Sequence, residues 1–226
     1  MSAKILSVLL LLMPNSYAST FSTKTEVSKI VNRHINASGG VRALRQLRSI
    51  TRIGEIEIFS GRPDESGKYR YRTDIVYPYK LREELVGNKI LVNRGTDGRV
   101  FWGWKDGGYR QIEDVDSKTE MLETATKANR EILWIAEEYK DLKISANNPK
   151  WALGSNCLSG FKSNVEVYIC FNNSTGLISA KGNSQEHRLY LKWTRVGDIA
   201  IPFNIIHFKK GEEITANYNY GNPNDK

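Results

Sequence analysis

The feature that most constrains the fold is a long succession of short segments in which apolar and polar residues alternate, starting at Ile50. The stretch "IEIFSGRPDESGKYRYRTDIVY" predicts two strands joined by a polar loop. On the second strand one side carries Tyr69, Tyr71, Thr73, Ile75 and Tyr77, and the other carries Lys68, Arg70, Arg72 and Asp74.

Two further groups of strands are predicted downstream. The stretch "KLREELVGNKILVNRGTDGRVFWGW" predicts three short strands, and its Asp97-Gly98 pair between apolar runs is a strong hairpin signal. After Pro149 seven more strands are predicted, over residues 151–153, 157–161, 165–171, 177–181, 187–193, 200–208 and 213–220. Glycine-containing and polar turns separate most of them.

Helices are predicted at two places only. Residues 25–36 carry a helical apolar stripe that stops at Gly39-Gly40, and residues 41–47 resume it. A longer helix, residues 117–139, is predicted from the capping-box pair Ser117 and Glu120. The order of helices, strands, one helix and strands predicts an α+β protein with a large meandering antiparallel sheet. A sheet of this length curls, and the helices would cover its inside.

The first residues are typical of a secretory signal peptide. A basic start is followed by an apolar run that Pro14 ends, and Ser16-Tyr17-Ala18 provides a cleavage site. The alternative is a membrane anchor, but the run is far shorter than the ~20 residues that a spanning helix needs. We therefore expect a signal peptide over residues 1–18 and a single soluble domain over 19–226, with no lipid anchor and no transmembrane helix.

The formal net charge of +8 favours anionic partners such as lipid headgroups. Export argues against nucleic acid. An equally weighted alternative is that the basic surface serves solubility alone.

Two cysteines, Cys157 and Cys170, lie on either side of a predicted hairpin. If the turn centres on Ser163-Asn164, the two face each other across the strands. In an exported protein this favours a structural disulfide, with two free thiols or a redox pair as the alternatives.

No catalytic or metal-ligating motif is recognisable. His34, His187 and His207 are far apart in sequence and match no metal-ligand spacing. There is no GxSxG elbow and no phosphate loop. We expect a protein that is not an enzyme and that uses no cofactor and no metal.

Alternation marks several large apolar residues as candidates for lining a cavity inside the curled sheet. For each of them ordinary core packing is the competing interpretation. The candidates are Ile56, Ile58, Tyr69, Tyr71, Ile75, Val100, Trp102 and Trp104.

Four stretches together resemble periplasmic outer-membrane lipoprotein-sorting proteins of the LolA/LolB/RseB-like superfamily. The stretches are "NASGGVRALRQLRSITRIGEIEI", "GTDGRVFWGW", "FNNSTGLISA" and "VGDIAIPFNIIHFKKGEEI". The matching residues are Gly39, Gly40, Leu44, Leu47, Ser49, Ile50, Gly54, Asp97, Gly98, Trp102, Thr175, Gly176, Leu177, Gly197, Ile201 and Pro202. They follow the family's order over nearly the whole of residues 19–226.

The resemblance implies an unclosed, strongly curved antiparallel barrel with helices on its concave face. It also implies a soluble periplasmic carrier that holds lipid or lipoprotein acyl chains in a hydrophobic cavity for transfer toward the outer membrane. Its partners would be a lipid or lipidated protein and a membrane-bound donor or acceptor protein. The alternatives are a non-catalytic regulatory or scaffold module of the cell envelope that contacts a protein partner, and an enzyme acting on an envelope lipid.

Overall fold

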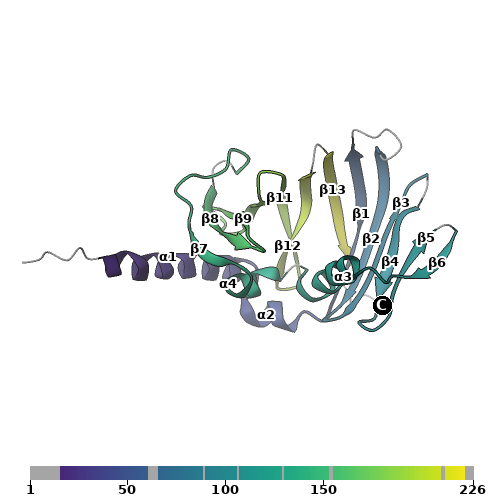
Figure 1. The fold of residues 1–226 in the computed structure, drawn as a ribbon, viewed down its shortest axis with the longest axis horizontal. Helices are drawn as coiled ribbons and strands as arrows, with labels where there is room; N and C mark the ends of the chain where they lie inside the picture. The colour runs from purple at the N-terminus through teal and green to yellow at the C-terminus, as the bar shows by residue number, and fades with distance from the viewer. Residues whose placement is uncertain are drawn as a thin grey trace, which may run out of the picture.

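The fold is described from a computed structural model, which places residues 16–60, 66–88, 90–105, 107–128, 130–152, 155–209 and 212–221. Within these residues the strands form one antiparallel sheet in the order β6-β5-β4-β3-β2-β1-β13-β12-β11-β10-β9-β8-β7. Two meanders are thus joined by the pairing of β1 with β13. The sheet curves strongly without closing, and the helices lie against it (Figure 1). The predicted α+β open barrel is confirmed.

The strands agree closely with the alternation in the sequence. The first meander contains β1 (Ser49–Phe59), β2 (Gly67–Val76), β3 (Lys80–Val86), β4 (Ile90–Thr96), β5 (Phe101–Lys105) and β6 (Gly108–Gln111). The second contains β7 (Lys140–Ile144), β8 (Ser155–Lys162), β9 (Val165–Asn172), β10 (Ile178–Gly182), β11 (Glu186–Val196), β12 (Ile199–Lys209) and β13 (Glu212–Gly221). The edge strands β6 and β7 were not predicted. The strand predicted at 151–153 is wrong where the structure describes it, because Ala152 closes a turn by donating its N–H to the Pro149 carbonyl.

Two helices precede the first strand, α1 (Ser16–Ala37) and α2 (Gly40–Gln46), and a sharp break separates them. Gly39 has φ +114°, and a Cβ there would lie 2.3 Å from the Asp198 carbonyl oxygen. Only glycine tolerates both conditions, so the chain turns here directly against the β11–β12 turn. The helix α1 begins nine residues before the predicted segment, and residues 1–15 of the predicted signal peptide lie outside the described residues.

The long helix predicted over 117–139 is wrong, because the segment is divided. It forms α3 (Val115–Lys127), the 3-10 helix η1 (Glu131–Trp134) and α4 (Ile135–Glu138). The N-cap is Asp114, whose carboxylate accepts the Ser117 N–H at 2.7 Å. After α3 the chain turns so that the buried Arg130 stacks on the Tyr77 ring at 3.9 Å and donates to the Thr126 carbonyl.

The main core lies between these helices and the concave face of the sheet. Leu44 of α2, Met121 of α3, and Ile50 and Ile75 of the sheet have at most 1% of their surface exposed. Arg94 of β4 ties α3 to this face through Glu83 and Glu120, each 2.8 Å away. We call α3, η1 and α4 the helical cover. In Figure 1 the strands β13, β1 and β2 extend beyond it.

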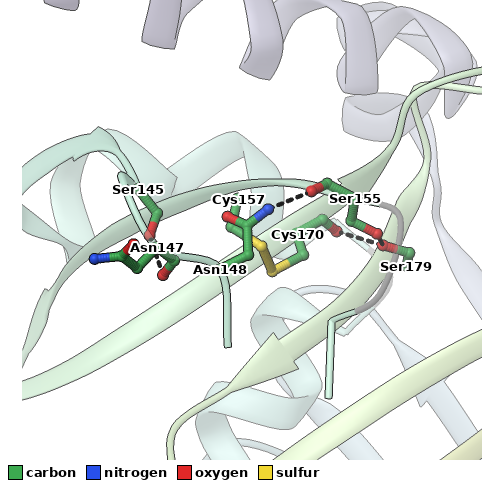
Figure 2. Close-up of a disulfide and its surroundings, with 7 residues drawn as sticks. All are labelled: Ser145, Asn147, Asn148, Ser155, Cys157, Cys170 and Ser179. Carbon is green, nitrogen blue, oxygen red and sulfur yellow. Dashed lines mark hydrogen bonds between the residues drawn. A yellow bond between two sulfur atoms is a disulfide. The ribbon is translucent and has the colours of Figure 1, made fainter. Parts of the chain in front are cut away.

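A disulfide joins Cys157 and Cys170 on the other, convex face. The two residues pair directly across β8 and β9, and the turn centres on Ser163 and Asn164, as predicted. Both turn residues have positive φ. Figure 2 shows the polar contacts around the bridge: Asn148 donates to the Ser155 carbonyl at 2.6 Å, and Ser179 donates to the Cys170 carbonyl. The predicted structural disulfide is confirmed.

Candidate functional site

A cavity of about 400 Å³ lies between the helical cover and the concave face of β10, β11 and β12. Its wall combines apolar side chains with a large number of charged ones. The apolar part includes Ala128, Ile132, Ile178, Trp193, Pro202 and Ile205, and the charged part includes Arg52, Glu120, Glu123, Lys127, Glu131, Glu138, Lys162, Lys181 and Arg188. We call this space the concave cavity.

An apolar row runs from the concave cavity across the sheet. Cross-strand pairing places Tyr190 beside Ile205, Ile205 beside Ala216, Ala216 beside Ile56, and Ile56 beside Tyr69. Directly paired residues on one face of a sheet contact each other, so these five form a continuous surface over β11, β12, β13, β1 and β2. Ile56, Tyr69 and Ala216 are buried, whereas Ile205 and Tyr190 line the concave cavity.

A basic row lies next to the apolar row on the same face. Lys181 of β10 pairs with Arg188 of β11, and Arg188 pairs with His207 of β12. Beyond His207 the row continues with Ile214 and Ile58. Glu186 lies at its margin, 2.9 Å from His207 Nε2 and 3.8 Å from Lys209 Nζ. The curved sheet therefore presents an apolar strip with the two cations Lys181 and Arg188 beside its β11 end.

Lys181 is surrounded by protein but retains exposed surface, because its side chain faces the concave cavity. Burial acts to lower the pKa of Lys181, but the carboxylate of Glu131 opposes it, and the net shift of the pKa is upward. The amine is therefore protonated at neutral pH. Burial also raises the pKa of Tyr190, which keeps this phenol neutral and able to donate a hydrogen bond.

An ion-pair network closes one side of the concave cavity. Glu138 of α4 lies 2.6 Å from Lys127 of α3 and 3.2 Å from Lys162 of β8. Glu123 of α3 lies 3.5 Å from Lys127 and 4.0 Å from Lys162. Burial tends to raise the pKa of Glu138, but the two lysines lower it overall, so Glu138 is ionised at neutral pH. These pairs join the helical cover to the second meander.

Five of the eight predicted cavity residues come together on the concave face. Ile56 pairs with Tyr69, and Ile75, Tyr71 and Ile58 share their face. Ile75 is 1% exposed and belongs to the core beneath the helical cover. The other four lie on β1 and β2, and the apolar row connects this part of the sheet to the concave cavity. Their role as ligand contacts stays a prediction.

The other three predicted residues lie at the far edge of the sheet. Because Phe101 points into the core, Trp102 and Trp104 point to the convex face, where both contact Tyr109 edge to face with ring centres 5.2 and 5.0 Å away. Val100 precedes β5 and is 52% exposed. The lining of the concave cavity includes none of the three. Alternation predicts that Val100, Trp102 and Trp104 share one side of a strand, but it does not specify whether that side is concave or convex. The face becomes clear only from the pairing of Trp102 with Gly95 and Gln111.

Sequence reasoning missed Lys181, Arg188 and Tyr190. The signal for Arg188 and Tyr190 is present in "EHRLYLKW", where these two residues fall on one side of the strand. A basic residue on an alternating strand is normally assigned to the solvated side, so the pattern alone favours the wrong face. Among the described residues no group of His, Cys, Asp or Glu has a metal-binding arrangement, and no helix is long and apolar enough to cross a membrane.

Solved structures with the same architecture show the class of fold. A LolA superfamily protein from Nitrosomonas europaea superposes with a TM-score of 0.53 at 14% identity, covering 85% of this chain and 91% of that one. An outer membrane lipoprotein-sorting protein domain from Vibrio parahaemolyticus gives 0.56 at 8% identity, and a DUF1329 family protein from Desulfovibrio piger gives 0.57 at 8% identity. Each of these two covers 88% of this chain and 94% of its own.

The chain therefore has a LolA-like fold. No protein-family model matches its sequence, and no curated protein matches it either.

Proposed function

We propose that the protein is a periplasmic carrier that binds lipid or lipoprotein acyl chains on its concave face for transfer toward the outer membrane. The observation that carries the proposal is the apolar row, which leads from Tyr69 to the concave cavity in a LolA-like fold. The lipoprotein-sorting domain among the structural neighbours supports the same class of cargo.

The size of the concave cavity suits one acyl chain. Ligand pockets in proteins have volumes of roughly 300–1,000 Å³, so about 400 Å³ is at the small end of the range. Each CH₂ removed from water contributes ~0.8 kcal/mol, so a long chain represents on the order of 10 kcal/mol of transfer free energy. This favours a carrier over free diffusion between membranes.

Uptake and release require the helical cover to move away from the second meander. The ion pairs of Glu138 hold it closed, and the break at Gly39-Gly40 is the hinge that we propose for α1 and α2. Binding of this kind involves no covalent chemistry. Partners would be the lipid or lipidated protein itself and a membrane-bound donor or acceptor.

The proposed location follows from residues 1–18 and from the disulfide. A cleaved signal peptide over 1–18 would leave the domain 19–226, and disulfides persist in oxidising compartments such as the periplasm. N-terminal sequencing of the exported protein tests the cleavage site, with Ser19 expected as the first residue.

Native mass spectrometry of the protein, purified from cell envelopes without detergent, tests the carrier function. A carrier is expected to show a mass increment that solvent extraction identifies as an acyl lipid. A chain that stays empty and co-purifies with a protein partner would instead favour a regulatory or scaffold module.

A further inference from the structure

We propose that one end of the sheet, with α2 at its centre, is a docking surface for a lipid bilayer that carries anionic headgroups. The cations of this surface are Arg33, Arg42, Arg45, Arg48, Lys80 and Arg195. We call them the basic end. The inference goes beyond the proposed carrier function, because it gives this end a lipid surface as its partner whatever the concave face binds.

The topology gathers these residues at one end of the molecule. The β2–β3, β9–β10 and β11–β12 turns of the antiparallel sheet all lie at the end where β1 begins, and α2 lies there too (Figure 1). Arg33 donates to a carbonyl of the β9–β10 turn at 2.6 Å, and Gly39 packs against the β11–β12 turn. The Arg48 carbonyl accepts the Tyr77 N–H of the β2–β3 turn at 2.9 Å. The basic end is therefore continuous from β9 to β3.

The charges of the basic end are not used to hold the fold together. Within the described part of the chain, none of its six cations forms an ion pair with a carboxylate. Arg33 and Arg195 donate to backbone carbonyls, which leaves their positive charge in place. Arg42 and Arg45 lie three residues apart on α2 and both are exposed, whereas Leu44 between them is buried in the core. Their guanidinium groups are thus free to contact phosphate oxygens, which arginine binds in a bidentate manner.

Carboxylates flank the basic end on the side of β5. Residues 113–116 include three of them, and they follow Ile112, whose N–H donates to the Phe101 carbonyl at 2.9 Å. Asp97 lies in the β4–β5 turn, and Asp198 in the β11–β12 turn is an acidic residue within the basic end itself. The positive charge is therefore concentrated around α2, which orients the protein with α2 toward an anionic surface.

Exposed apolar side chains accompany the cations. Val41 of α2, Val76 at the end of β2 and Tyr79 of the β2–β3 turn are 42%, 48% and 57% exposed. A surface that serves solubility alone needs no such side chains. Helices and turns that lie on a bilayer combine apolar or aromatic residues, which enter the headgroup layer, with Lys and Arg, which contact the anionic lipids. The combination favours a bilayer over an acidic protein as the partner.

Co-sedimentation of the protein, purified from cell envelopes, with lipid vesicles tests the proposal. One set of vesicles contains phosphatidylcholine alone, and the other contains an equal mixture of phosphatidylcholine and the anionic phosphatidylglycerol. Each Lys or Arg near an anionic bilayer strengthens binding about fivefold, so the mixed vesicles should bind at least on the order of a hundredfold more tightly. Added salt should weaken this binding, because it screens the charges.

Substitutions assign the binding to the basic end. The test variant combines Arg42→Gln, Arg45→Gln and Arg48→Gln. It should bind the mixed vesicles more weakly by on the order of a hundredfold. The matched control removes the same charge from exposed positions on the edge strands β6 and β7 by combining Arg110→Gln, Lys140→Gln and Lys143→Gln. It should bind nearly as tightly as the wild type.

Two further measurements separate docking from folding and from the carrier function. The test variant should keep the melting temperature of the wild type, because the three side chains are exposed. It should also keep the wild-type affinity for dodecanoate in calorimetry, because the lining of the concave cavity includes none of the three. Loss of vesicle binding together with unchanged dodecanoate binding is the expected result.

Equal binding to the two vesicle types, or wild-type binding by the test variant, would overturn the docking surface and leave the carrier function intact. Absence of binding to either vesicle type would also overturn it, in favour of an acidic protein partner or of a surface that serves solubility alone. Failure of the wild type to bind dodecanoate would contradict the carrier function and not the docking surface.

Discussion

His34 connects α1 to the second meander by hydrogen bonds, although its ring is buried among aromatic side chains. Its Nδ1–H donates to the Gly176 carbonyl at 3.1 Å, which leaves Nε2 to accept from the Ser38 hydroxyl at 3.3 Å. The ring lies beside Phe171 and Trp193 and is 3% exposed. Burial lowers the pKa of His34 to about 4, so the native protein holds this imidazole neutral.

The free energy of unfolding should therefore decrease as the pH is lowered, because of His34. The unfolded chain binds a proton at this group below pH ~6.5, whereas the folded chain does so only near pH 4, so the stabilisation is complete above 6.5 and is lost on acidification. Between pH 7 and pH 5 this group should cost about 2 kcal/mol of unfolding free energy. Urea unfolding at both pH values measures it, and His34→Gln should reduce the loss by that amount. The same pH dependence in the variant would contradict the assignment.

Gly39 is a second residue whose role is determined by its surroundings. Gly39→Ala should lower the unfolding free energy by at least about 2 kcal/mol, because φ is +114° and the new Cβ would overlap the Asp198 carbonyl. Gly197→Ala is the matched control, since φ is also positive there but the space is open; it should cost only ~1 kcal/mol. Equal costs measured by urea unfolding would show that the close approach of α2 to the β11–β12 turn is unimportant.

Among the elements, the β8–β9 hairpin is the one that sequence predicted best. The turn lies at Ser163-Asn164, where it was expected, so the register that places Cys157 opposite Cys170 follows from the position of the turn. The bridge lies beneath Trp151 and Tyr168 with 0–1% of each cysteine exposed. It closes a covalent loop within a hairpin that is already paired.

The double substitution Cys157→Ala and Cys170→Ala should lower stability by ~3 kcal/mol, because the loop-closing constraint on the unfolded chain is lost. For a chain of this size the melting temperature should fall by ~6–12 °C. Calorimetry of the oxidised wild type and the variant measures the difference. Reductant should lower the melting temperature of the wild type alone, and an equal response in both proteins would refute the account.

The helical cover was predicted only in part: a helix was expected there, but its division into three elements was not. The apolar side from Met121 onward predicts a helix correctly, but the predicted N-cap Ser117 is wrong, because Asp114 caps the helix and Ser117 lies within it. Nothing local shows that the helix ends at Lys127. The division depends on tertiary contacts, above all on Arg130 stacking on Tyr77, which is distant in sequence. Edge strands β6 and β7 were missed for a related reason, since they are short and pair on one side only.

The ion pairs of Glu138 should set the rate at which the helical cover opens. Glu138→Gln weakens the contacts with Lys127 and Lys162, which at ~1 kcal/mol corresponds to about fivefold faster uptake and release of a fluorescent fatty acid. Stopped-flow fluorescence measures both rates. Glu137→Gln, an exposed neighbour on α4, is the control and should leave both rates unchanged. Wild-type rates in Glu138→Gln would show that these pairs do not hold the cover.

For the whole molecule, alternation was sufficient to predict a large antiparallel sheet that curls, with helices over its inside, and the family resemblance added that the sheet stays unclosed. Alternation also brought Ile56, Ile58, Tyr69, Tyr71 and Ile75 together, because residues two apart on a strand must share a face. It could not decide which face was concave at the far edge, so it grouped Trp102 and Trp104 with them. The basic row could not be predicted from the sequence, because its members come from β10, β11 and β12 and meet only through strand pairing.

Photocrosslinking with a diazirine fatty acid, followed by mass spectrometry of the labelled peptides, tests the central claim most directly. If the concave face holds the acyl chain, labels should map to β1, β11 and β12 around Ile56, Tyr190 and Ile205, and excess unlabelled fatty acid should abolish them. Labels confined to the convex cluster of Trp102, Trp104 and Tyr109, or absent altogether, would contradict it.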